Sequence, residues 1–222
     1  LGRRAIAAGL LAAALPLRHA RAASLPVPPS NRLTFRVMRK GSDIGSHALV
    51  FVARPGTLVI TSAVSIVIRL GPIALFRYTH HVTETWATPD GQPATLASGE
   101  AKTDDDGTRH FMRAKASAAG LVVDGSDGGH YVAPAGTLLA THWNRAELDR
   151  PMVNPQGGKL LSPTVTPFPP APLALANGTS VPARRYALTG DTVLDLYYDT
   201  ANLWAGIGFV ARDGSAVTYQ RV

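Results

Sequence analysis

Hydrophobic and polar residues alternate along most of the chain from Leu33 onward. Alternation with a period of two is typical of β-strands that bury one face and expose the other. The clearest run extends from Thr57 to Leu70, where Ser62 is the only polar residue on the apolar face. The next run, from Phe76 to Trp86, has an aromatic face and a polar face. The pattern therefore predicts a protein that is mainly β.

Turn signals separate these runs. Asp-Gly between alternating segments is a strong hairpin signal, and it recurs at Asp90-Gly91, Asp106-Gly107, Asp124-Gly125, Asp127-Gly128 and Asp213-Gly214. The repetition predicts an antiparallel meander of about ten to twelve strands, which at that size forms a strongly curved sheet or open barrel. Prolines between residues 163 and 172 predict an edge strand at best, followed by a loop.

One long break interrupts the meander at residues 141–158. Asn144 has the position of a helix cap, Glu147 follows at capping-box spacing, and Pro151 ends the segment. The pattern predicts one short helix near residues 144–149. Because one or two turns cannot form a layer, we expect this helix to lie across the sheet or in its mouth.

The first 22 residues have the three parts of a secretory signal peptide. Arg3-Arg4 precedes the uncharged run Ala5–Leu15, and small residues precede a cleavage point after Ala22. The apolar run is shorter than the ~20 residues that span a bilayer, so we expect removal and a periplasmic protein. The arginine pair fits the twin-arginine route, and ordinary secretion is the alternative. Residues 23–32 are then a proline-rich tether, and residues 33–222 a single β domain.

Charge and composition exclude several partner classes. The formal net charge is +7, of which four charges belong to arginines of the signal peptide, so the mature chain carries +3. Its basic residues are dispersed, and no nucleic-acid partner is predicted. No segment after the signal peptide predicts an integral membrane protein. The chain has no cysteine, which excludes disulfides and thiol chemistry. No cofactor or metal motif is present, and the oligomeric state stays open.

Seven residues are candidates for ligand binding, because loops and aromatic sheet faces carry binding groups on a rigid scaffold. They are His142, Trp143, Asn144, Tyr78, His80, Trp86 and Gln156. The alternative for the 142–144 cluster is a helix cap beside a tryptophan buried in the core. No catalytic residue is predicted.

Three further groups have weaker functional interpretations. His80, His110 and His142 could meet across strands around a metal ion, but surface or core histidines are the default. Asp104–Asp106 resembles a calcium loop only in composition, and a hairpin turn is favoured. The carboxylates of Asp191, Asp195 and Asp199 share one strand face, which is either an acid–base site or the solvated side of a sheet.

Several motifs resemble an uncharacterised family of exported proteobacterial proteins, a domain of unknown function. They are Ala140-Thr141-His142-Trp143-Asn144, Asn154-Pro155-Gln156-x-Gly158, and Gly190-Asp191 with Asp195-Leu196-x-Tyr198-Asp199. The resemblance covers nearly the whole mature chain and implies no established activity. The fold it implies is loosely similar to that of periplasmic lipoprotein carriers.

Three functional hypotheses follow. The first is a non-enzymatic carrier with an apolar cavity for a lipid-like ligand or an apolar protein segment, with the short helix as a lid. The second is a hydrolase built on the His142 loop and the Asp191–Asp199 face. The third is a structural cell-envelope protein without a ligand. A large apolar cavity would favour the carrier. A hydrogen bond between His142 and Asp195 or Asp199 would favour the hydrolase, and a filled core would favour the structural protein. The expected lining of the cavity is Leu58, Ile60, Val64, Ile66, Ile68, Phe76, Tyr78 and Trp86.

Overall fold

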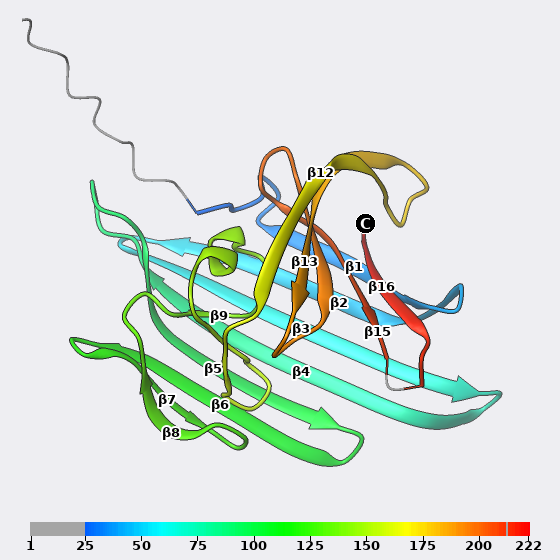
Figure 1. The fold of residues 1–222 in the computed structure, drawn as a ribbon, viewed down its shortest axis with the longest axis horizontal. Coiled ribbons are helices and arrows are strands. Elements are labelled where there is room, and N and C mark those ends of the chain that lie inside the picture. The colour runs from blue at the N-terminus through cyan, green and yellow to red at the C-terminus, as the bar shows by residue number, and fades with distance from the viewer. Residues whose placement is uncertain (1–24, 212) are drawn as a thin grey trace, which may run out of the picture.

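A computed structural model describes residues 25–222 except Arg212, and strands dominate it (Figure 1). Thirteen strands form one antiparallel sheet in the order β12-β13-β14-β15-β16-β1-β2-β3-β4-β5-β6-β7-β8. Their bounds are β1 (Arg32–Arg39), β2 (Ser42–Arg54), β3 (Thr57–Leu70), β4 (Ile73–Ala87), β5 (Thr95–Asp105), β6 (Thr108–Ser117), β7 (Gly120–Gly125), β8 (Gly129–Ala133), β12 (Thr164–Ala174), β13 (Ser180–Thr189), β14 (Leu194–Asp199), β15 (Trp204–Val210) and β16 (Ala216–Arg221).

The sheet is a meander whose two chain ends meet in the middle. β16 pairs with β1, through partners such as Val37 and Tyr219, so β8 and β12 are the free edges and the sheet does not close into a barrel. The expected antiparallel, strongly curved sheet is therefore confirmed.

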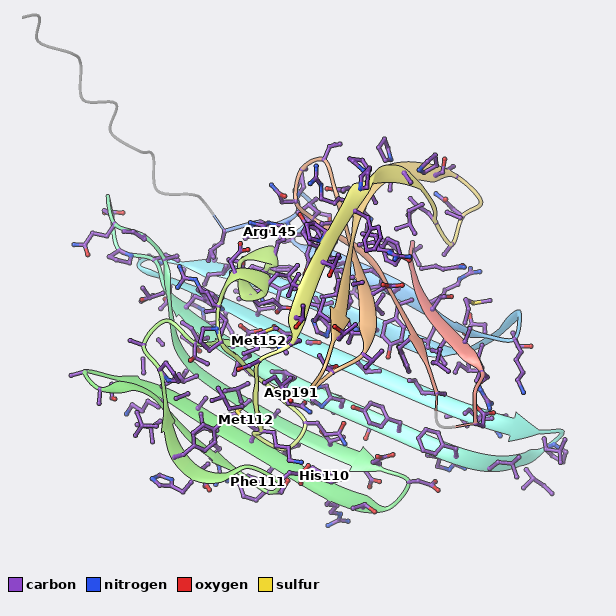
Figure 2. All side chains as sticks on the ribbon, viewed as in Figure 1. His110, Phe111, Met112, Arg145, Met152 and Asp191 are labelled. Carbon is purple, nitrogen blue, oxygen red and sulfur yellow. The ribbon has the colours of Figure 1, made fainter. Side chains whose placement is uncertain are left out.

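The break in the alternating pattern becomes a segment that covers the inner face of the sheet. This cover segment, residues 134–163, joins the two edge strands and contains β9 (Leu138–Leu139), η1 (Arg145–Asp149), β10 (Met152–Val153) and β11 (Leu160–Leu161). β9, β10 and β11 form a small separate sheet. Met112 of β6 and Met152 of β10 are both fully buried members of one cluster between the sheet and this segment (Figure 2).

Two hydrophobic clusters result. The main cluster contains Phe35, Leu49, Ile60 and Trp86 from the sheet and Trp143 from the cover segment. A smaller cluster, here called the distal cluster, consists of Val37, Val64, Ile66 and Val217, with half-buried apolar neighbours that include Ile44, Ile68, Phe76, Tyr78, Phe209 and Tyr219. The expected continuous apolar face is thus divided, because the main cluster includes cover-segment residues such as Trp143, whereas the distal cluster includes none.

Local details differ from the sequence-based expectations. The segment that follows Thr164 is not a loop: β12 continues through its prolines to Ala174, which an edge strand tolerates because one side needs no ladder bonds. Asp124-Gly125 lies in the paired end of β7 rather than in a turn. The helix is a five-residue 3₁₀ helix capped by Asn144.

The described part of the expected tether lies on the domain. Leu25 and Val27 are partly buried against the main cluster, and Pro28 is buried. The expected signal peptide and its cleavage point lie outside the described residues. No helix in the described part of the chain is long and apolar enough to span a membrane.

Candidate functional site: a pocket lined by three histidines

A small cavity of about 160 Å³ lies between the sheet and the cover segment, at the border of the distal cluster. We call it the histidine pocket. Its lining comes from β2, β3 and β4, from the cover segment, and from β15 and β16: His47, Ser62, Val64, Tyr78, His80, Val82, Ala140, Thr141, His142, Asn154, Pro155, Gln156, Trp204, Ile207 and Tyr219.

Strand register brings the floor of this pocket together. Val64 of β3 pairs with His47 on β2 and with His80 on β4, and His80 pairs in turn with Thr103 on β5. Residues paired directly across neighbouring strands point to the same face. The two imidazoles therefore flank one valine in a single row across three strands.

His47 is buried and has one free ring nitrogen. Its Nε2 lies 2.6 Å from the hydroxyl oxygen of Ser62, while its Nδ1 is buried and has no hydrogen-bond partner among the described residues. Trp204 and Tyr219 contact the ring edge to face. Burial, with smaller contributions from His142 and His80, lowers the pKa of His47 from 6.5 to about 3. His47 is therefore neutral at physiological pH.

His80 is a second neutral imidazole. Its Nδ1 lies 2.7 Å from the hydroxyl oxygen of Thr103. Burial, followed by the nearby His81 and His142, lowers the pKa of His80 from 6.5 to about 4. Tyr78 lies beside it, and its hydroxyl donates a long 3.4 Å hydrogen bond to Gln156 Oε1. Burial raises the pKa of Tyr78, and it raises that of Tyr219 to about 12.

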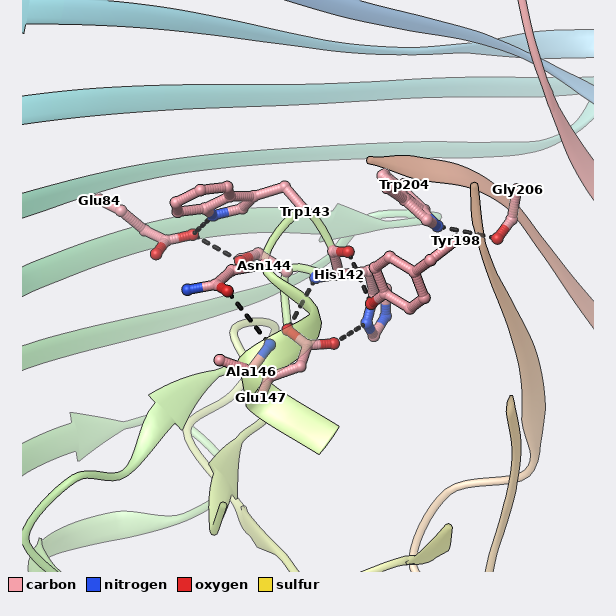
Figure 3. Close-up of polar contacts among 10 residues, drawn as sticks. Glu84, His142, Trp143, Asn144, Ala146, Glu147, Tyr198, Trp204 and Gly206 are labelled. Carbon is pink, nitrogen blue, oxygen red and sulfur yellow. Dashed lines mark hydrogen bonds and ion pairs between the residues drawn. The ribbon is translucent and has the colours of Figure 1, made fainter. Parts of the chain in front are cut away.

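His142 is held from three sides (Figure 3). Its backbone has a positive φ of 69°, a conformation uncommon for a residue with a side chain. The buried carboxylate of Glu147 accepts from the backbone N–H of His142 at 2.9 Å and lies 2.6 Å from its Nδ1, while the Tyr198 hydroxyl donates to its carbonyl at 2.8 Å. A carboxylate only accepts, so Nδ1 of His142 carries a proton. The Glu147 carboxylate does not form the expected capping box, because it bonds to His142 instead of the Asn144 N–H.

A second buried carboxyl anchors the cover segment (Figure 3). Glu84 of β4 accepts from the Thr141 hydroxyl at 2.5 Å and from the indole N–H groups of Trp143 and Trp86, each at 2.9 Å. Burial raises the pKa of Glu84, and these three hydrogen bonds oppose that shift. Trp143 is 1% exposed and packs edge to face against Phe51 and Trp86. Trp143 is therefore part of the core.

The structure separates the seven candidates into three groups. Tyr78, His80, His142 and Gln156 line the histidine pocket, and Trp143 lies in the core. Trp86 and Asn144 border a larger pocket of about 480 Å³ beside Leu25, Pro26, Leu96, Leu121 and Leu138. The side-chain oxygen of Asn144 caps η1 by accepting from the Ala146 N–H at 3.1 Å.

Sequence reasoning missed five residues around the pocket: His47, Ser62, Glu147, Trp204 and Tyr219. A signal existed for two of them. His47 shares strand parity with Leu49 and Phe51, and Ser62 interrupts the apolar face of β3, so both place polar groups on a buried face. Buried polar groups need hydrogen-bond partners. The hydrogen bond between His47 and Ser62 gives each of the two side chains one partner.

None of the three carboxylates of the proposed hydrolase is hydrogen-bonded to His142, although Asp191 and His142 both line a separate cavity of about 180 Å³. The Asp199 carboxylate lies 2.9 Å from the Arg221 guanidinium, and the Asp195 carboxylate lies 3.6 Å from the Arg185 guanidinium. Asp191, visible in Figure 2, accepts from the Ser162 N–H at 2.8 Å.

The metal and calcium interpretations gain no support either. His110 pairs with Asp127 at 2.9 Å, and no group of three or more metal-binding side chains occurs within residues 25–211 and 213–222. Asp104 accepts from the Gly107 N–H at 2.7 Å, as in a hairpin turn.

Comparisons with known proteins agree on the fold and give no activity. No curated protein matches the chain. A crystal structure described as a beta-barrel-like protein of the domain of unknown function DUF1849 from Brucella abortus has a TM-score of 0.52 and 12% sequence identity, over 86% of this chain and 94% of that one. At this identity the likeness concerns the fold alone. The family model described as domain of unknown function DUF6134 matches residues 35–222, and the chain belongs to that family.

Proposed function

We propose that this protein is an exported, non-enzymatic binding module, and that the histidine pocket takes the polar end of a small amphiphilic ligand. The observation that carries the proposal is the buried, unpartnered Nδ1 of His47, at a pocket that two further imidazoles also line. Buried polar atoms without partners are rare in folded proteins, and a bound ligand is one way to satisfy them. Polar groups that converge on one cavity are typical of ligand sites.

The size and surroundings of the pocket support an amphiphile. A volume of about 160 Å³ is below the ~300–1,000 Å³ of sites that enclose a whole drug-sized ligand. Val64, Tyr78 and Tyr219 line the pocket and also belong to, or pack against, the distal cluster. The polar end would therefore lie among the histidines, and the apolar part along half-buried residues such as Ile68, Phe76 and Phe209.

The chemistry of the pocket narrows the polar end. His47 and His80 are neutral, and Glu147 holds a proton on Nδ1 of His142. The Tyr78 and Tyr219 hydroxyls remain protonated because burial raises their pKa values. A neutral hydroxyl or amide, which both donates and accepts, suits this set better than a carboxylate or phosphate, since no lysine or arginine lines the pocket among the described residues.

The test uses Trp204, which lines the pocket, as a fluorescent reporter. The wild type and Trp204→Phe are titrated with decanol, decanamide and decanoate, and the emission change that Trp204→Phe loses is assigned to Trp204. We expect decanol or decanamide to change the emission and His80→Ala to weaken binding by about tenfold or more, as losing a central contact does. His81→Ala is the matched control, because His81 is adjacent in sequence, exposed and on the opposite face. Absence of binding by all three probes, or equal loss in both variants, would refute the proposal.

A hydrolase is the second candidate, favoured by one observation. Ser62 Oγ lies 2.6 Å from His47 Nε2, in the pocket that His142, the partner of Glu147, also lines. Against it, His47 has no acidic partner on Nδ1 and its pKa of about 3 makes it a weak base. Turnover of p-nitrophenyl butyrate that disappears in Ser62→Ala would establish the hydrolase and displace the carrier.

A further inference from the structure

The β3–β4 hairpin ends in an apolar tip that extends past its neighbours (Figure 1). Pairing of β3 with β2 stops at Ile66, and pairing of β4 with β5 stops at Tyr78, whereas the hairpin's own ladder continues to Leu70 and Ile73. The last residues of the hairpin therefore have no flanking strand on either side. We call residues 69–75 the hairpin tip.

Three large apolar side chains of this tip face solvent. Leu70 is 68% exposed, Ile73 62% and Leu75 57%. Leu70 and Ile73 are cross-strand partners, so they form one continuous surface. On the inner face, Ile68 pairs with Phe76, and both are only half-buried against the distal cluster. Exposed apolar residues are common singly, but a contiguous group usually marks an interaction surface.

Two arginines lie at the base of the tip, one as its first residue and one two residues after its end. Arg69 and Arg77 are exposed, and neither forms an ion pair with any described residue. Guanidinium groups bind phosphate through paired N–H donors. The acidic turn Asp104–Asp106 adjoins Arg77, where Asp106 accepts from the Arg77 backbone N–H at 3.2 Å. The tip is therefore an apolar surface with two free cations, and not a strongly basic patch.

We propose that the hairpin tip is a membrane-contact site, which inserts Leu70, Ile73 and Leu75 into the interface of a phospholipid bilayer while Arg69 and Arg77 bind lipid phosphates. Apolar tips with cationic neighbours match the order of layers in a bilayer surface. Membrane contact at the tip does not require a ligand in the histidine pocket.

Vesicle sedimentation of the chain from Ala23 tests the proposal. The vesicles are phosphatidylcholine alone, or with about 30% phosphatidylglycerol. We expect binding to both, and a loss of about tenfold or more in the partition coefficient when Leu70, Ile73 and Leu75 are all replaced by Ser. Replacing both Arg69 and Arg77 by Gln is expected to reduce binding by a few fold.

The matched control carries Ser at three other exposed apolar positions, Val132, Val193 and Val210, which are 51%, 71% and 70% exposed. Its binding should equal that of the wild type. Circular dichroism verifies that each variant folds. If the triple variant does not fold, Leu75→Ser alone is used in its place. The proposal would be overturned if the wild-type protein did not bind vesicles, or if the control and tip variants lost vesicle binding equally. Self-association that the tip substitutions abolish, without vesicle binding, would assign the tip to a second copy and overturn it as well.

Discussion

Acid should destabilise this protein through the two buried histidines of the pocket. In the folded state the pKa of His47 is lowered from 6.5 to about 3 and that of His80 from 6.5 to about 4, in both cases chiefly by burial. Below pH 6.5 the unfolded chain therefore takes up protons that the folded chain does not. The free energy of unfolding consequently falls as the pH decreases from about 6.5 toward 3.

The expected size follows from these pKa values. One pKa unit corresponds to about 1.4 kcal/mol. At pH 5 an imidazole of the unfolded chain is almost fully protonated, whereas His47 and His80 in the folded chain are almost fully neutral. Relative to pH 8, each histidine should then reduce the free energy of unfolding by about 2 kcal/mol, which is a large part of a typical stability.

Urea unfolding at pH 8 and pH 5 measures this effect in the wild type, in His47→Gln and in a control, His130→Gln, at an exposed histidine. The change in free energy between the two pH values should be smaller by about 2 kcal/mol in His47→Gln and unchanged in the control. Glu84 acts in the opposite direction, because its pKa is raised and the folded state gains a proton there. Its contribution cancels when the proteins are compared.

The reasoning would be refuted if His47→Gln kept the full pH dependence of the wild type. His80→Gln provides the same comparison if His47→Gln is too unstable to measure. Because only the difference between two pH values enters, a general destabilisation by either substitution does not affect the conclusion.

Three further predictions concern the core, the cover segment and the N-terminus. Trp143→Ala should lower the free energy of unfolding by about 3–5 kcal/mol, as truncation of a buried aromatic does, and Phe111→Ala, at a site 39% exposed, by far less; equal effects would contradict the core position of Trp143. Gly158→Ala should lower the melting temperature, since the φ of Gly158 is +83° and a Cβ there would lie 2.9 Å from Gly125 Cα. Gly178→Ala is the milder control, because Gly178 has a similar φ of +82° but open space around it. An equal shift in both variants would mean that backbone strain is the whole effect. Protein recovered from the periplasm should begin at Ala23, as N-terminal sequencing can establish, and Lys at both Arg3 and Arg4 should block export only on the twin-arginine route; a protein that still starts at Leu1 would end the export proposal.

Much of the fold could be predicted from the sequence, because the signals are local. Alternation along β3 and β4 reports which face of each strand is buried, and Asp-Gly turns such as Asp106-Gly107 report where the chain reverses. The break at residues 141–158 was equally visible. It predicted a short helix with Asn144 as its cap, although not its 3₁₀ form.

The limits of each strand were harder to predict. Proline disfavours a strand only where its missing N–H is needed, and β12 has an edge that needs none, so Thr164–Ala174 pairs with β13 despite its prolines. Whether a segment is an edge is a property of the whole sheet.

The candidate site depended most on tertiary structure. His142, Tyr78, His80 and Gln156 were candidates from their own segments, but His47 and Ser62 were not, because strand parity shows that a polar residue is buried without showing what it meets. The placement of His47 and His80 on either side of Val64 depends on the register of three strands. The contact of His142 with Glu147 forms where the backbone of His142 has a positive φ. The sequence by itself determined the strands, the turns and the covering break. Only the packing of that break against the curved sheet decided that Trp143 fills the core while the histidines are left around a cavity. Contacts between distant segments are set by the free energy of the whole fold and not by local pattern.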